Sequence, residues 1–159
     1  RGIEATKKYT QSDKGKAAKL RYSQSDNAKN YYREYAKSKK GKKVIRKYWN
    51  KKRETDPIFK LGHIYRNRLR QFLKATNMKK THPTFVMVGC TQKFLKKYLE
   101  KKFKPGMTWK NHTLKGWHVD HKTPLSSAKT PRALEKLMHY TNTRPMWGTE
   151  NIKKGNRII

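Results

Sequence analysis

The 159-residue chain is poor in acidic residues, in apolar residues and in cysteine. It contains 10 Asp and Glu but 42 Lys and Arg, so its formal net charge at pH 7 is +32. A compact protein with this charge repels itself unless a polyanion neutralises it, and the commonest polyanion is nucleic acid. Because only 33% of the residues are hydrophobic, against roughly 45–50% in globular domains, we expect one small domain and an extended arm.

Two further absences narrow the class of protein. The single cysteine, Cys90, excludes intrachain disulfides and cysteine-based zinc sites. No apolar run approaches the roughly 18–20 residues of a membrane-spanning helix, and the first residues lack the apolar stretch of a signal peptide. We therefore expect a soluble, intracellular protein that is not secreted and has no membrane partner.

Residues 1–57 have the composition of a basic arm, with 19 basic and 6 acidic residues and a net charge of +13. The arm contains a 13-residue repeat. Because serine is a preferred helix N-cap, the repeat predicts short helical turns that each begin at a serine. A continuous helix is disfavoured, since 13 residues advance about 1300° and leave successive tyrosines roughly 140° apart. The repeated residues are Tyr9, Tyr22, Tyr35 and Tyr48, followed at three positions by Ser12, Ser25 and Ser38.

The arm is expected to follow the backbone of double-stranded DNA. Its cations would meet phosphates while its tyrosines pack on sugars or on neighbouring turns. The alternative is a disordered, solvated basic tail. The arm residues assigned to DNA contacts are Lys14, Lys16, Arg21, Lys42, Lys43 and Arg46.

Residues 58–104 are predicted to form a helical linking region. Apolar residues recur at helical spacing over residues 58–73, which indicates an amphipathic helix that starts near Pro57. Residues 84–88 are expected to be a short β-type run, and Thr91 is expected to cap a second helix. The cations on the other faces of the first helix, which are candidate DNA contacts, are Arg66, Arg68 and Arg70.

Residues 58–159 contain only four carboxylates, and this scarcity limits the metal sites that they can form. Nucleases that hold two metal ions use clusters of acidic ligands, so one metal ion with mixed ligands is favoured here. Asp120 is the carboxylate of interest because His118 and His121 flank it. In a strand, His118 and Asp120 would point to one face and His121 to the other face or into the following turn. The four carboxylates are Glu100, Asp120, Glu135 and Glu150.

Three motif blocks resemble those of the HNH endonuclease family. The first is Asp-His-x-x-Pro at residues 120–124, the second contains Asn142, and the third contains Asn151 within the segment 150–155. The spacing of nine between the two asparagines is similar to that in the HNH domains of RNA-guided CRISPR nucleases. The variant with Trp-His-x-Asp-His also resembles stand-alone HNH nucleases of phages, large DNA viruses and mobile elements. The resemblance covers about residues 103–157.

The resemblance implies an α+β protein with a C-terminal ββα-metal module at residues 105–159, in which two strands and a helix hold one divalent cation. Asp120 and Asn151 would be the protein ligands of that ion. Their oxygen atoms suit Mg²⁺, for which Mn²⁺ can substitute, better than Zn²⁺. His121 would be the general base, and Asn142 would brace the loop that aims it.

Three further residues near the motifs have open assignments. His118 would contact the scissile phosphate or assist the metal shell, or else pack beside Trp117. Lys154 lies one helical turn after Asn151 and would reach the scissile or an adjacent phosphate, or else be a solvated cation. Its neighbour Lys153 is a candidate DNA contact.

The function that the resemblance implies is metal-dependent hydrolysis of DNA, as in homing or phage endonucleases. One active site would nick one strand, and a double-strand cut would need two copies, as in a homodimer. The enzyme would act in a bacterial cytoplasm during phage infection or in a virus-infected host cell. Composition alone favours the alternative, a non-catalytic basic nucleic-acid-binding protein with a decayed HNH fold, and RNA cleavage is a third reading. The intact set of Asp120, His121 and Asn151 argues for the enzyme.

Overall fold

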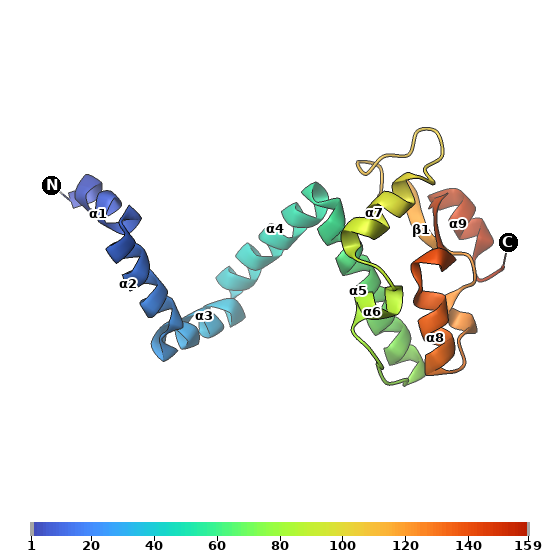
Figure 1. The fold of residues 1–159 in the computed structure, drawn as a ribbon, viewed down its shortest axis with the longest axis horizontal. Helices are drawn as coiled ribbons and strands as arrows, with labels where there is room; N and C mark the ends of the chain where they lie inside the picture. The colour runs from blue at the N-terminus through green and yellow to red at the C-terminus, as the bar shows by residue number, and fades with distance from the viewer. Residues whose placement is uncertain (1, 159) are drawn as a thin grey trace. The chain divides into compact units, whose positions relative to one another are not determined.

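The computed structural model describes residues 2–158 and has a mainly helical α+β fold. The α+β class expected from the sequence is confirmed. The chain divides into an N-terminal unit (residues 2–51) and a C-terminal unit (residues 52–158) (Figure 1). Within the described residues, no helix combines the length and the apolar character needed to cross a bilayer.

The helices of the N-terminal unit are joined by single serines. Each serine has extended backbone, and its Oγ accepts a hydrogen bond of 3.0–3.2 Å from the backbone N–H three residues later. These contacts confirm the predicted serine N-caps. The segments that the serines join are helices of 10–17 residues and not the short turns that the repeat predicts. The helices are α1 (Gly2–Gln11), α2 (Asp13–Gln24), α3 (Asp26–Lys37) and α4 (Lys39–Thr55), and the serines are Ser12, Ser25 and Ser38.

A small residue also recurs in each repeat, three positions after the serine. Gly15, Ala28 and Gly41 occupy this position and are buried. A Cβ atom on Gly15 would lie 2.0 Å from the carbonyl oxygen of Tyr9, and one on Gly41 would lie 1.8 Å from that of Tyr35. The end of each helix therefore closes against the start of the next, which leaves room only for a small residue. This signal is present in the sequence but is missed when only tyrosine and serine are counted.

The C-terminal unit packs its helices around one hydrophobic core. Helix α5 (Pro57–Thr76) begins at Asp56, whose Oδ1 accepts a backbone hydrogen bond of 3.0 Å. Helix α7 (Gln92–Glu100) begins at Thr91, and this confirms the expected cap. Helix α8 (Pro131–Met138) completes the helical layer. The most deeply buried apolar residues are Leu61, Tyr65, Leu69, Val88, Leu95, Leu99, Trp117, Val119, Leu134 and Met138.

The β-type run expected at residues 84–88 is wrong. These residues form the short helix α6 (Thr84–Val88), which ends at Gly89 with a φ of +73°. One helical turn buries Thr84, Met87 and Val88 on the same side. A short apolar run fits a strand or a helix equally well, and packing against the core decides between them here.

The sheet consists of two antiparallel strands, β1 (Trp117–His121) and β2 (Thr143–Trp147), in which Asp120 pairs with Arg144. Helix α9 (Gly148–Lys154) follows β2 directly and contacts both strands. The order of strand, strand and helix therefore brings the end of β1 beside α9. Two single 3₁₀ turns complete the unit, η1 (Leu125–Ser127) and η2 (Tyr140–Asn142).

Candidate active site

A pocket of about 240 Å³ lies between α5, the end of β1, the loop after β1 and α9. Residues from the first and third motif blocks meet there, although they are far apart in the sequence. Asn142, from the second block, does not line the pocket. The lining residues include Arg68, Asp120, His121, Pro124, Ser126, Asn151 and Lys154.

Asp120 is buried and is held by two cations. Arg144 Nε donates to Asp120 Oδ2 at 3.0 Å, and Lys154 Nζ donates to Asp120 Oδ1 at 2.9 Å. Lys154 also donates to the carbonyl oxygen of His121 at 2.7 Å and is only 2% exposed. The ammonium group therefore lies against the end of β1 and holds Asp120 and the His121 backbone in place.

His121 is 8% exposed, and its Nε2 is buried without a hydrogen-bond partner among the described residues. The ring lies 6.1 Å from the ring of Tyr65 on α5, whereas His118 and Asp120 bond to α9, which confirms the expected alternation along β1. Burial, and after it the charge of Arg68, lowers the pKa of His121 to about 3. The imidazole is therefore neutral at pH 7, and an anion bound in the pocket would raise its pKa again.

The Asn142 side chain bonds to backbone groups of the loop that follows His121 and of α8. Its Nδ2 donates to the carbonyl oxygens of Thr123 (2.9 Å) and Leu137 (2.8 Å), and its Oδ1 accepts from Thr123 N (3.0 Å). The Asn142 carbonyl oxygen also accepts from Lys122 N at 2.8 Å. This arrangement is that of a brace that fixes the chain just after His121.

Asn151 lines the pocket from α9, with His118 behind it. Asn151 Nδ2 donates to His118 Nδ1 at 3.1 Å, and His118 Nε2 donates to the Leu114 carbonyl oxygen at 3.1 Å. Both ring nitrogens of His118 are thus used within the protein, and His118 is not among the pocket-lining residues. The contact fixes the amide of Asn151 so that Oδ1 is the atom that can coordinate a cation.

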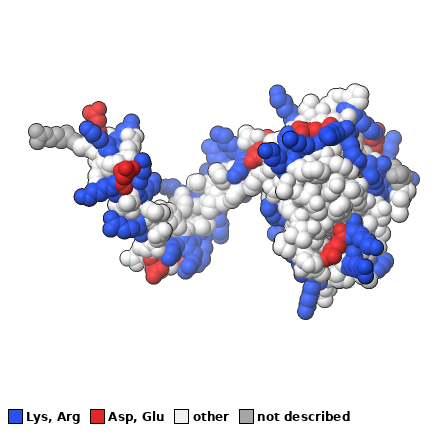
Figure 2. Space-filling view, viewed as in Figure 1, with Lys and Arg blue, Asp and Glu red and all other residues white. Residues whose placement is uncertain are grey.

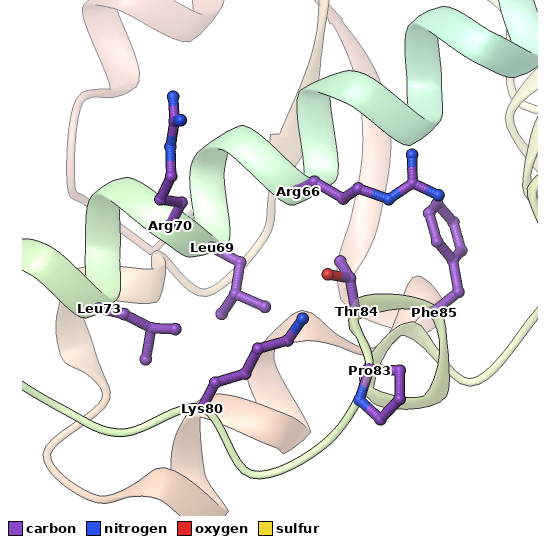
Figure 3. Close-up of a pocket in the computed structure, with 8 residues that line it drawn as sticks. All are labelled: Arg66, Leu69, Arg70, Leu73, Lys80, Pro83, Thr84 and Phe85. Atoms are coloured by element: carbon purple, nitrogen blue, oxygen red, sulfur yellow. The ribbon is translucent and has the colours of Figure 1, made fainter. Parts of the chain in front are cut away.

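The three arginines of α5 separate into two groups. Arg68 lines the pocket of His121, and its Nη1 is buried with no hydrogen-bond partner in the described part of the chain. Arg66 and Arg70 are exposed and line a different pocket of about 520 Å³, into which the Lys80 ammonium group points (Figure 3). The Arg66 guanidinium there lies 5.6 Å from the centroid of the Phe85 ring. The sequence groups the three cations together, but only one of them reaches the candidate active site.

The remaining candidate DNA contacts are exposed cations. All six of those assigned to the arm are exposed, as is Lys153 on α9. Lys16 forms only a surface ion pair of 3.5 Å, with Asp13. Figure 2 shows Lys and Arg over both units, with few acidic side chains between them. These cations are accessible to a polyanion.

A divalent ion in the pocket would have few protein ligands. Among residues 2–158, no three His, Cys, Asp or Glu side chains gather at one point. Asp120 and Asn151 offer oxygen atoms, which suit Mg²⁺, an ion that keeps several waters and often binds phosphate oxygens. Lys154 Nζ already lies between two oxygens, Asp120 Oδ1 and the His121 carbonyl. The donor set therefore fits a hard cation once the Lys154 ammonium group moves away from Asp120 Oδ1.

Comparison with known proteins finds similarity to a viral protein of uncharacterized function. No protein-family model matches the chain, and no solved structure matches it. The chain is similar to uncharacterized protein L246 of Acanthamoeba polyphaga mimivirus, with 32% identity over 124 residues. The match covers 68% of this chain and 52% of the viral protein, so the chain spans about half the length of that relative.

Proposed function

We propose that the protein is a metal-dependent DNA endonuclease of the HNH type. The observation that carries the proposal is the meeting of Asp120, His121 and Asn151 in one pocket, where His121 Nε2 has no hydrogen-bond partner among the described residues. The order of two antiparallel strands and a following helix also supports it. The similarity to an uncharacterized mimivirus protein is in keeping with a virus-related protein.

The reaction would be hydrolysis of a phosphodiester by water. A water molecule beside His121 gives a proton to the imidazole as the water oxygen bonds to phosphorus. The bond from phosphorus to the 3′ oxygen breaks, and the leaving oxygen takes a proton from solvent. The products are a 5′-phosphate and a 3′-hydroxyl end. The chemistry that a bound Mg²⁺ supplies is Lewis-acid stabilisation of the charge on the phosphate and on the leaving oxygen.

Several side chains would position the reacting groups. Asn142 holds the loop after His121 through two hydrogen bonds to Thr123, and a third hydrogen bond ties Asn142 to Leu137 of α8, which limits the movement of the imidazole. His118 orients the amide of Asn151. Arg144 and Lys154 fix the Asp120 carboxylate. Asp120 and Asn151 would hold the divalent ion, and Lys154, once freed from Asp120, would contact an adjacent phosphate.

The substrate would be double-stranded DNA, held mainly through its phosphates. The net charge of +32 and the exposed cations of both units supply this attraction, and binding should weaken steeply with salt. One site would nick one strand, and a double-strand cut would need two copies of the chain.

A second candidate function is nucleic-acid binding without cleavage. The observation that favours it is that both Asp120 oxygens already accept hydrogen bonds from cations, one from Arg144 and one from Lys154. If the ammonium group cannot be displaced, no divalent ion can bind there. The fold would then only present a basic surface.

Nicking of supercoiled plasmid by the purified chain separates the two functions. We expect conversion to open circles with Mg²⁺ or Mn²⁺, none with chelator, and 5′-phosphate and 3′-hydroxyl ends at the nicks. Structured RNA, tested in parallel, should remain intact. Binding of plasmid without any cleavage in either metal would establish the non-catalytic function instead.

A further inference from the structure

The pocket carries more positive charge than its carboxylate can balance. Asp120 is the only carboxylate among the described residues that line the pocket, and its two oxygens already accept from Arg144 and Lys154. Arg68 brings a third cation, whose Nη1 is buried and unbonded in the described part of the chain. Because a buried charge is costly unless it is paired, such groups normally have a partner. The pocket therefore lacks an anion.

His121 adds a second unsatisfied atom to the same pocket. Its Nε2 is buried and has no hydrogen-bond partner among residues 2–158. Two residues that line one small pocket each carry an orphan buried polar atom, which indicates a missing polar ligand, since buried polar groups are satisfied almost everywhere in proteins. A phosphate group meets both needs, because its oxygens accept from guanidinium and it carries negative charge.

We propose that Arg68 binds the scissile phosphodiester directly, so that a helix outside the motif blocks contributes a catalytic residue. The inference rests on the proposed function and deepens it by naming the side chain that holds the reacting phosphate. The guanidinium group stabilises the negative charge that develops in the transition state and keeps phosphorus near the water beside His121. Arg66 and Arg70 do not share this role, because they line the other pocket (Figure 3).

The first test compares nicking by the wild-type chain and by Arg68→Met. We expect the rate at saturating enzyme to fall about 10²–10³-fold, while the Kd for plasmid changes by no more than about threefold, since one cation among many is lost. The melting temperature should stay the same or rise, because a buried unpaired charge is removed. A residue with a purely structural role would instead lower it.

A matched control removes a cation elsewhere in the same unit. Lys93 is exposed on α7, so Lys93→Met should nick at the wild-type rate. Arg66→Met should weaken plasmid binding by no more than about threefold, because it removes one candidate DNA contact among many, in the other pocket. A wild-type nicking rate in Arg68→Met would overturn the proposal. If that variant does not fold, Arg68→Lys decides: losing the planar fork should slow nicking at least about tenfold, and an unchanged rate would overturn the proposal.

The second test does not depend on cleavage. Inorganic phosphate is titrated into metal-free protein while the imidazole signals of His121 are followed by NMR at constant pH. We expect a saturable shift in the wild-type protein and its loss in Arg68→Met. If the wild-type chain cuts no nucleic acid, the proposed endonuclease function fails, and this titration still reports on Arg68. A wild-type His121 signal that ignores phosphate would refute the role of Arg68.

Discussion

The two units of the chain are stabilised in different ways. In residues 2–51, the structure relies on contacts between neighbours in the sequence, namely serine caps and small residues at the turns. Ala28 is the only buried hydrophobic residue described there. The C-terminal unit instead joins distant segments through a core and a buried charge cluster. Local rules therefore explain the first unit, whereas tertiary packing creates the candidate active site of the second.

Substitution of an aspartate in each unit should produce the largest contrast. Asp120→Asn leaves Lys154 and Arg144 without their carboxylate, so we expect a loss of about 3–5 kcal/mol in unfolding free energy and a fall in nicking of about 10³-fold. Asp13→Asn removes a fully exposed ion pair and should change neither property. Denaturant unfolding and plasmid nicking check both variants. Equal stability of the two variants would show that the Asp120 carboxylate does not stabilise the C-terminal unit.

Removal of a leucine side chain should give the next largest contrast. Leu99 is 0% exposed, and Leu99→Ala should cost about 2–5 kcal/mol of unfolding free energy. Leu20 is 58% exposed, and Leu20→Ala should cost less than about 0.5 kcal/mol. Urea unfolding followed by tryptophan fluorescence for Leu99→Ala, and by helical circular dichroism for Leu20→Ala, measures both. A large loss in Leu20→Ala would mean that the N-terminal unit has a core.

Acid should weaken only the C-terminal unit, which contains all six histidines. His112 stacks on Trp117 at 4.1 Å, and burial, followed by the charge of Lys60, lowers its pKa to about 3. The folded state therefore binds fewer protons than the unfolded state, whose histidine pKa is about 6.5, and stability falls as the pH drops from about 6.5 toward 3. At pH 4.5 this one residue should cost about 2–3 kcal/mol.

The substitution His112→Phe tests this origin, because phenylalanine keeps the stacking and cannot take a proton. The two proteins should be of similar stability at pH 7, and the variant should become the more stable one as the pH falls. Thermal unfolding at several pH values provides the comparison. Parallel losses in both proteins would assign the acid sensitivity to other groups.

The smallest effect is expected from a helix cap. Ser25→Ala removes the acceptor of the Ala28 N–H and should weaken the start of α3 by about 1 kcal/mol. Ser23→Ala is the matched control, because Ser23 Oγ bonds to the Leu20 carbonyl within α2 and caps no helix. Amide hydrogen exchange at residues 27–29 should accelerate in the first variant alone. Faster exchange throughout α3 and α4 in both variants would show that the helices are not locally stabilised.

Features that depend on neighbouring residues could be predicted from the sequence, whereas features that depend on tertiary packing could not. The serine caps and the cap at Thr91 depend on residues three positions apart, so they could be predicted. The run at residues 84–88 could not, because its helical form depends on the core that it covers. The recurring small residue at Gly15, Ala28 and Gly41 is visible in the sequence. The structure explains it by the close approach of the preceding helix.

The candidate active site was predictable in part. The motif blocks indicate Asp120, His121 and Asn151, which the structure brings to one pocket. The position of Lys154 on Asp120 depends on a contact across 34 residues, which no local pattern reveals. Helical spacing places Arg68 about 200° away from Arg66 and from Arg70 on α5, but the identity of the pocket that it faces depends on tertiary packing.

The most direct test of the central claim is the rate of Mg²⁺-dependent plasmid nicking by His121→Ala. We predict that the nicking rate falls by about 10²–10⁴-fold, the usual contribution of a general base, while plasmid binding is retained. His82→Ala should nick like the wild type, because His82 is exposed and pairs with Glu135 outside the pocket. Nicking by His121→Ala at the wild-type rate would show that this pocket is not the active site.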